Sequence, residues 1–395
     1  GLDYLIDGTD AIGTIIFNEA DLSGNLGDAF QFDVTSGAIL TADTTVPMTP
    51  GTIINDFSGS GGNAFQGTVN GTDSIAIINI SDADADSSGA EGALFESVFG
   101  GFLAFNYTNG TLDMSGLDGL STNTETGATT TISLDNVTLN SNGQLVTVGQ
   151  GDGLVATVDG TDSTLNLMLN DISTSLNFEK GVNLNATNSG FIDSRSNTGL
   201  FESTFNQEEG LYFDAQSGGM IAFNSVLGTT SDNGLGGNFS GVRGLVDGDG
   251  SAATVSFDNF TSDFNTQDGF EFDVTNGGML VAEILSTPSD DPTATSQLSS
   301  ASNNVNGAGI RLTASDVMGV GTTSAALIME GDNEVSNNLE GLIVNATDTD
   351  MLAVLANGKF DNTGGVCELL GGYGVQMSAV LGRVAGVVVG GGPRG

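Results

Sequence analysis

The chain has 395 residues, including 60 glycines, and it carries 49 acidic residues against 7 basic ones, for a formal net charge of −42. So little positive charge excludes nucleic acids, phosphate-rich ligands and anionic membrane surfaces as partners, because the chain has almost nothing to neutralise their charge. Hydrophobic residues make up 38% and Phe occurs 22 times, so we expect a folded core under an acidic surface rather than a disordered acidic tail.

The chain has no His, and Cys367 is its one cysteine. This rules out His-based triads, His-ligated metals and an intrachain disulfide. We expect no membrane span, because the most apolar stretch, residues 369–389, is Gly-rich and interrupted by Gln376 and Arg383. The opening GLDYLIDGTD has neither Met nor a signal peptide, which indicates a processed form or a piece of a longer protein.

A repeated unit recurs along the chain. Its first clear copy, DAFQFDVTSGAILTA at residues 28–42, returns as GLYFDAQSGGMIAFNSV at residues 210–226 and as GFEFDVTNGGMLVA at residues 269–282. Each unit reads Gly, apolar, any residue, apolar, Asp or Asn, apolar, then a polar turn and a second apolar run. The units begin, at steps of roughly 25 to 40 residues, near Gly27, Asn63, Gly153, Gly181, Gly210, Gly244, Gly269, Gly309 and Gly341.

Two regions depart from the repeat. Between about residues 82 and 150 the frame blurs, and LFESVFGGFLAFN at residues 94–106 resembles two parts of other units with the strand between them missing. After Glu368 there is no further acid. We therefore predict one continuous repeat body over residues 1–368 with an irregular or inserted region at about 82–150. Residues 369–395 would form a Gly-rich apolar terminal coil or tail, with a possible role in assembly.

Within a unit the apolar residues alternate with polar ones. Phe270, Phe272 and Val274 would point inward, and the residues between them outward. No long segment keeps a helical period, and Gly, Asn and Thr interrupt every candidate helix. Short strands that repeat at about 30 residues predict an all-β fold, a parallel β-solenoid of roughly 11–13 coils with about 25–40 residues per coil. The outward Asp33, Asp214 and Asp273 would belong to a carboxylate row.

One corner of each coil shows a recurrent Asn. The residues that stand four positions before a strand-opening Gly are Asn177, Asn206, Asn265 and Asn337. Stacked one per coil, their side chains could hydrogen-bond to one another and to the turn backbone. The NxxxG pattern followed by alternating apolar residues resembles the right-handed parallel β-helix of the pectate-lyase-like superfamily. That resemblance implies right-handed coils with corner Asn residues and, for a non-enzymatic branch, brings no chemistry.

Catalytic patterns of similar families are missing from the sequence. Polygalacturonase-like hydrolases carry NTD, DD, GHG and RIK segments, whereas the one DD here is Asp290–Asp291 in STPSDDPT. Pectate-lyase-like enzymes use a basic residue, usually Arg, beside calcium-binding carboxylates. The seven basic residues fall at no shared coil position by the repeat frame: Lys180, Arg195, Arg243, Arg311, Lys359, Arg383 and Arg394. We therefore predict no enzyme, although acid/base catalysis by two carboxylates stays an open alternative.

Calcium is the expected ligand. The segment SDADADSSG imitates half of an EF-hand loop, but Ser87 and Ala93 replace its turn Gly and bidentate Glu. The candidate ligands are Asp82, Asp84, Asp86, Asp247, Asp249, Asp348 and Asp350. Each Asp pair also fits ordinary turn chemistry. The general argument is that like charges about 5 Å apart repel by about 3 kcal/mol per pair at an effective dielectric near 20, which Ca²⁺ or salt would relieve.

These features favour a non-catalytic structural protein, extracellular or at the cell surface, as a subunit of a layer, sheath, filament or adhesive stalk. Its expected partners are copies of itself, arranged head-to-tail or laterally, divalent cations and neutral glycans. The alternative is a glycan-binding or glycan-cleaving β-helix. Carbohydrate grooves favour exposed aromatic residues, and the chain has no Trp, 4 Tyr and Phe mostly at inward positions.

Overall fold

The computed structural model describes residues 1–44, 55–143, 151–286, 299–316, 323–331, 333–336, 338, 340–347, 349–356, 359–361, 375–380 and 383–390. These residues form strands and turns and contain no helix. Their strands pair in parallel and stack as a β-solenoid of about 11 turns with about 29 residues per coil, which confirms the predicted fold class. The chain divides into two compact units, Gly1–Arg195 (unit 1) and Ser196–Gly395 (unit 2).

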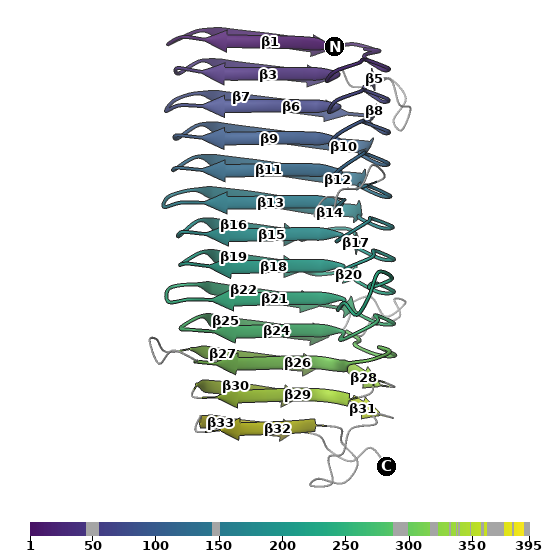
Figure 1. Cartoon of the computed structure of the whole chain (residues 1–395), viewed down its shortest axis with the longest axis vertical. Helices are drawn as coiled ribbons and strands as arrows, with labels where there is room; N and C mark the ends of the chain where they lie inside the picture. The colour runs from purple at the N-terminus through teal and green to yellow at the C-terminus, as the bar shows by residue number, and fades with distance from the viewer. Residues whose placement is uncertain are drawn as a thin grey trace. The chain divides into compact units, whose positions relative to one another are not determined.

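In unit 1 each coil contributes one strand to each of two parallel sheets (Figure 1). Sheet A contains β1 (Leu2–Asp7), β3 (Phe30–Thr35), β6 (Phe65–Asn70), β9 (Ala93–Val98), β11 (Leu120–Glu125), β13 (Leu154–Asp159) and β15 (Val182–Thr187). Sheet B contains β2 (Ile12–Phe17), β4 (Ile39–Thr44), β7 (Ile75–Ser81), β10 (Phe102–Thr111), β12 (Thr129–Thr138), β14 (Thr164–Ser173) and β16 (Phe191–Ser196). The short strands β5 (Asn55–Asp56) and β8 (Ala83–Asp84) pair with each other, and β8 also pairs with the end of β10.

Unit 2 repeats this plan. Its sheet A strands are β18 (Leu211–Gln216), β21 (Val242–Asp247), β24 (Phe270–Thr275), β26 (Ala308–Ser315), β29 (Glu340–Thr347) and β32 (Val375–Val380). Its sheet B strands are β19 (Met220–Ser225), β22 (Ala252–Asp258), β25 (Met279–Ser286), β27 (Ser324–Gly331), β30 (Asp350–Ala356) and β33 (Arg383–Gly390). Short strands mark a third side: β17 (Phe201–Glu202), β20 (Gly228–Thr229), β23 (Phe260–Thr261), β28 (Glu334–Ser336) and β31 (Lys359–Asp361).

The core lies between the sheets of each coil. Phe270, Phe272 and Val274 are fully buried, as their alternation predicted. The ring of Phe270 lies 5.2 Å from that of Phe257, which comes from sheet B, so the two sheets meet through aromatic side chains. Burying a side chain of this size contributes about 1.5–3 kcal/mol, and a coil can bury it only against its neighbours.

Two glycines in the core make room for rings from the preceding coil. A Cβ at Gly67 would lie 2.0 Å from Cζ of Phe32, and a Cβ at Gly244 would lie 2.0 Å from Cζ of Phe213. Gly244 is therefore an inward position of β21, which begins at Val242. The predicted repeat start near Gly244 is wrong by three residues, because a core Gly was taken for the Gly that opens a strand.

The region at about 82–150 was predicted to be irregular or inserted, but residues 82–143 form regular coils. Residues 144–150 lie outside the described residues. Strands β9 and β11 pair in register with Ala93 beside Leu120, and β10 pairs with β12. The segment 94–106 holds most of β9, a turn and the first half of β10, so no strand is missing. The similarity of LFES at 94–97 to LFES at 200–203 is misleading, because the first lies in sheet A and the second contains the short strand β17.

Near the chain's end, β32 pairs with β29 and β33 pairs with β30. Residues 375–380 and 383–390 of the predicted terminal coil or tail therefore add a coil to unit 2. The remainder of residues 369–395 lies outside the described residues.

Candidate functional site

A buried asparagine ladder runs along one corner of unit 2. The ladder residues, all at most 4% exposed, are Asn206, Asn233, Asn265, Asn304 and Asn338. The backbone N–H of each of the first four donates to Oδ1 of the Asn in the next coil, over 3.0, 3.0, 2.9 and 2.8 Å in chain order. Buried backbone donors need an acceptor, and this corner supplies one from the neighbouring coil.

Unit 1 has a ladder of the same kind. The backbone N–H of Asn142 donates to Oδ1 of Asn177 over 3.0 Å, and the N–H of Ser115 donates to Oδ1 of Asn142 over 2.9 Å. The structure thus places the predicted Asn177, Asn206 and Asn265 in ladders. Asn337 lies outside the described residues, and the ladder residue of that coil is its neighbour Asn338.

The sequence reasoning missed Asn142, Asn233 and Asn304. In each case more than three residues separate the Asn from the strand-opening Gly, so the NxxxG spacing fails. Four coils of unit 2 show a better signal, a small residue that stands three positions before the Asn and is at most 2% exposed: Ser203, Thr230, Ser262 and Ala301. This signal does not find Asn142, because Leu139 stands at that position.

A second ladder, unexpected from the sequence, uses buried carboxylates just before sheet A. Oδ1 of Asp118 accepts the N–H groups of Gly151 (2.8 Å) and Asp152 (3.0 Å), and Oδ1 of Asp152 accepts the N–H of Lys180 over 2.6 Å. Burial raises the pKa of Asp152 to about 7, although the charge of Lys180 opposes that rise. The signal was available as an acid directly before the strand-opening Gly. These carboxylates hold one coil to the next.

The predicted calcium ligands of the SDADADSSG segment are engaged in hydrogen bonds within the coil and to the next coil. Oδ1 of Asp86 accepts the N–H of Asp113 over 2.9 Å, and burial raises the pKa of Asp86 to about 6. Oδ1 of Asp84 accepts the N–H of Asp86 over 3.0 Å. Asp82 has φ 50° and accepts Nδ2 of Asn109 at 3.4 Å.

The other candidate ligands lie in turns of unit 2. Oδ1 of Asp247 accepts Oγ1 of Thr275 (2.6 Å) and Nδ2 of Asn276 (2.7 Å), both from the next coil. Asp249 lies in the turn between β21 and β22. Asp350 begins β30, and Asp348 lies outside the described residues. Within the described ranges no three Asp, Glu or Cys residues gather in a way that could hold a metal ion, so calcium binding stays a prediction.

The predicted outward carboxylate row is interrupted. Asp214 and Asp273 share one column of sheet A, but Leu245 stands between them. In unit 1, Asp33 has Leu5 and Thr68 as its register neighbours. Stacked like charges are therefore absent at these three acids, and the repulsion argument for calcium does not apply to them.

An alternating charge column crosses sheet A of unit 2. Arg243 pairs in register with Glu271, and Glu271 with Arg311. The prediction that the basic residues share no coil position is thus wrong for these two arginines. The error arose because the repeat start was placed at Gly244. The true strand-opening residues, Gly241 and Gly309, stand two positions before Arg243 and Arg311.

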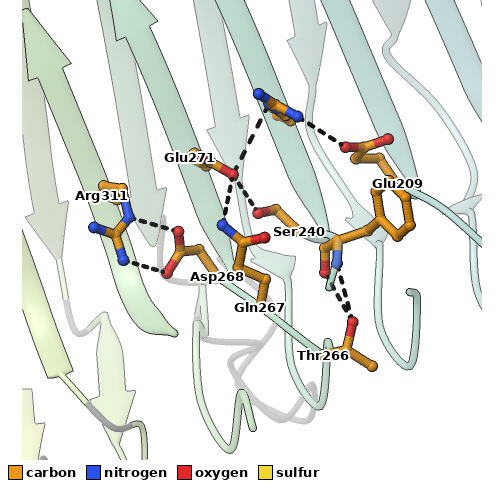
Figure 2. A network of polar contacts seen from close by, with 9 residues as sticks. Glu209, Ser240, Thr266, Gln267, Asp268, Glu271 and Arg311 are labelled. Carbon is orange, nitrogen blue, oxygen red and sulfur yellow. Dashed lines mark hydrogen bonds and ion pairs between the residues drawn. The ribbon is translucent and has the colours of Figure 1, made fainter. Parts of the chain in front are cut away.

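The column is tied to buried acids (Figure 2). Nε of Arg311 lies 2.7 Å from Oδ2 of Asp268, which is fully buried, and Asp268 also accepts the N–H of Ala308. Arg243 lies 3.6 Å from Glu209 and 4.0 Å from Glu271.

Burial raises the pKa of Glu271, while the hydroxyl of Ser240, which donates to its Oε2 over 2.7 Å, lowers it. Nε2 of Gln267 also donates to this oxygen over 3.4 Å, as Figure 2 shows. A carboxyl with a raised pKa could act as an acid or base. Here Glu271 is already engaged by Ser240, Gln267 and Arg243. The network therefore joins four coils and leaves no free acid/base pair at this carboxyl.

Comparisons with known proteins give no family. No protein-family model matches the sequence, and no curated protein matches it. Among solved structures, the chain is similar to a TibA fragment that was hyper-glycosylated by TibC, with 12% identity over 98% of this chain and 99% of that one and a TM-score of 0.25. This similarity transfers no role. Among the described residues no helix has the length and apolarity to cross a bilayer.

Proposed function

We propose that the chain is a non-catalytic structural protein, extracellular or at the cell surface, that serves as a subunit of a layer, sheath, filament or adhesive stalk. The observation that carries this proposal is the use of recurrent buried polar residues. Asn206, Asn233 and Asn265 in unit 2 and Asp118 and Asp152 in unit 1 bond to the next coil instead of converging on one place. A catalytic site is singular, whereas these positions recur in every few coils.

Self-association and divalent cations belong to the same proposal. Copies that each carry a net charge of −42 repel one another at low salt, so assembly requires cations to screen or bridge them. Calcium suits the oxygen-rich turns chemically. The terminal segment 369–395, which lacks acids, is the proposed contact for another subunit.

The test is electron microscopy of the purified full chain at low salt, with and without 5 mM Ca²⁺ or EDTA as the added reagent. Ordered polymers that dissolve in EDTA support the proposal. A monomer under every condition that also degrades polysaccharides would overturn it in favour of a glycan-cleaving enzyme. Deleting residues 374–395 should abolish assembly while the remaining body keeps its melting transition.

A further inference from the structure

A row of side chains lies directly before the asparagine ladder in unit 2. Its members are Phe205, Asp232, Phe264 and Asn303, each one residue ahead of a ladder Asn. The N–H groups of Phe205, Asp232 and Phe264 donate to the carbonyls of Ser231, Asp263 and Ser302 in the following coil, over 3.3, 3.0 and 3.0 Å. The row therefore contains one residue from each coil, and Phe alternates with a polar residue along it.

Phe is an unfavourable residue at these two positions, both because of its backbone conformation and because its apolar ring is exposed. Phe205 and Phe264 each have φ 59°, in the left-handed region that disfavours large L side chains. Their rings are 46% and 53% exposed. Asp232 and Asn303 adopt the same φ at the same position with residues that tolerate it. The fold does not require Phe at these positions, so the two exposed rings are available for a contact outside the chain.

The spacing of the rings suggests what they contact. Phe205 and Phe264 lie two coils apart, which at the spacing of parallel strands is about 9.5 Å. In an extended β-1,4-linked glycan each sugar ring advances the chain by about one coil's rise, and alternate rings turn the same face to one side. Apolar C–H faces can stack on the two Phe rings. The intervening ring would then meet Asp232, whose carboxylate accepts hydrogen bonds from hydroxyl groups.

We propose that this row binds a neutral, extended β-1,4-linked glycan along the long direction of unit 2. The ligand is neutral because the chain is strongly acidic and Asp232 lies within the row. Binding involves no reaction, and it goes beyond the proposed structural role, since subunits can assemble without it. Most Phe side chains of the described residues point inward, as expected, and Phe205 and Phe264 are exposed exceptions.

Unit 1 has a related row without aromatic rings. Met114, Ser141 and Leu176 precede Ser115, Asn142 and Asn177, and their φ values are 54°, 59° and 61°. Met114 and Leu176 are 43% and 59% exposed. Aliphatic side chains offer no ring face for stacking, so unit 2 is the stronger binding surface.

The test titrates the full chain with cellohexaose and β-1,4-mannohexaose by isothermal calorimetry, with maltohexaose and oligogalacturonate as α-linked and acidic comparisons. The variants are Phe205→Asn, Phe264→Asn and the double variant. The matched control is Phe99→Asn, since Phe99 also has φ 52° and is 59% exposed but lies in the turn between β9 and β10. All variants are checked by thermal melting.

We expect at least one β-1,4-linked oligosaccharide to bind the native chain, each single variant to weaken it at least fivefold, and the double variant to remove binding. Phe99→Asn should bind as the native chain does. Because Asn tolerates a left-handed backbone, the melting temperatures of the Phe205 and Phe264 variants should be equal or higher, which separates binding from folding. No binding of either β-linked probe, unchanged binding in the double variant, or equal binding of maltohexaose or oligogalacturonate would overturn the proposal.

Discussion

The two units treat the buried acid before sheet A differently. In unit 1, Asp152 accepts the backbone N–H of Lys180 and Nδ2 of Asn183, and burial raises its pKa to about 7 although the charge of Lys180 opposes that rise. In unit 2, Asp268 accepts a backbone N–H and also binds the guanidinium of Arg311 at 2.7 Å. Backbone donors can therefore replace water around a buried carboxylate, but an arginine also compensates its charge. The two units should respond differently to mutation and to pH.

The largest effect is expected from Arg311→Met in unit 2. It leaves the fully buried Asp268 without its counter-ion, and breaking such a pair costs about 3–5 kcal/mol. The matched control is Arg195→Met, because Arg195 is 56% exposed although it lies 2.6 Å from Asp193, and exposed pairs contribute about 0–1 kcal/mol. Urea unfolding with hydrogen exchange should locate the loss in unit 2. Equal losses in both variants would contradict the comparison.

The asparagine ladder is common to both units and should contribute equally. Asn265→Ala removes the acceptor of the N–H and Nδ2 of Asn233, and Asn177→Ala does the same to Asn142. Buried donors left unpaired should cost about 2–3 kcal/mol in either variant. Asn224→Ala, on the exposed side of β19, is the control and should change the unfolding free energy by less than about 0.5 kcal/mol. A loss in one unit alone would show that only one ladder stabilises its unit.

The pH response should be reversed relative to acid denaturation. Asp86 and Asp152 have folded pKa values of about 6 and about 7, above the value near 3.9 of an unfolded Asp. Their contribution to stability is present below about pH 4 and is lost as the pH rises through 6 to 7. The unfolding free energy should therefore fall by about 2–4 kcal/mol between pH 5 and pH 8.

Asp152→Asn is the informative variant for this pH response. Its amide oxygen still accepts the N–H of Lys180, so the variant should lose part of the pH dependence and keep the fold. Calorimetric melting at pH 5, 6.5 and 8 measures both effects. A higher melting temperature at pH 8 than at pH 5 in the native chain would refute this electrostatic explanation.

The smallest effect is expected at the core glycines. Gly67→Ala in unit 1 and Gly244→Ala in unit 2 each place a methyl group against a Phe ring, and overpacking of this kind costs about 1–2 kcal/mol. Gly27→Ala is the control, because a Cβ there meets no atom within 4 Å. Equal decreases in melting temperature in the two core variants would show that a glycine makes room for a Phe ring in both units. No shift in either would mean that the rings move freely.

The sequence by itself determined the class of fold and the inward residues. Alternation at Phe270, Phe272 and Val274, repeated at about 30 residues without any helical period, allows few structures other than stacked parallel strands. Three ladder residues could also be identified where the spacing to the next Gly is regular. These properties are local, so each can be recognised within a single copy of the sequence repeat.

The tertiary structure decided everything that depends on register between coils. Arg243, Glu271 and Arg311 become neighbours only once Gly241 rather than Gly244 opens its strand. Loops of unequal length hide Asn233 and Asn304 from any fixed spacing. Left-handed backbone at Phe205 and Phe264 has no sequence signature, because the same position also accepts Asp and Asn. Side chains about 30 residues apart meet in these features, and a one-residue error in register separates them.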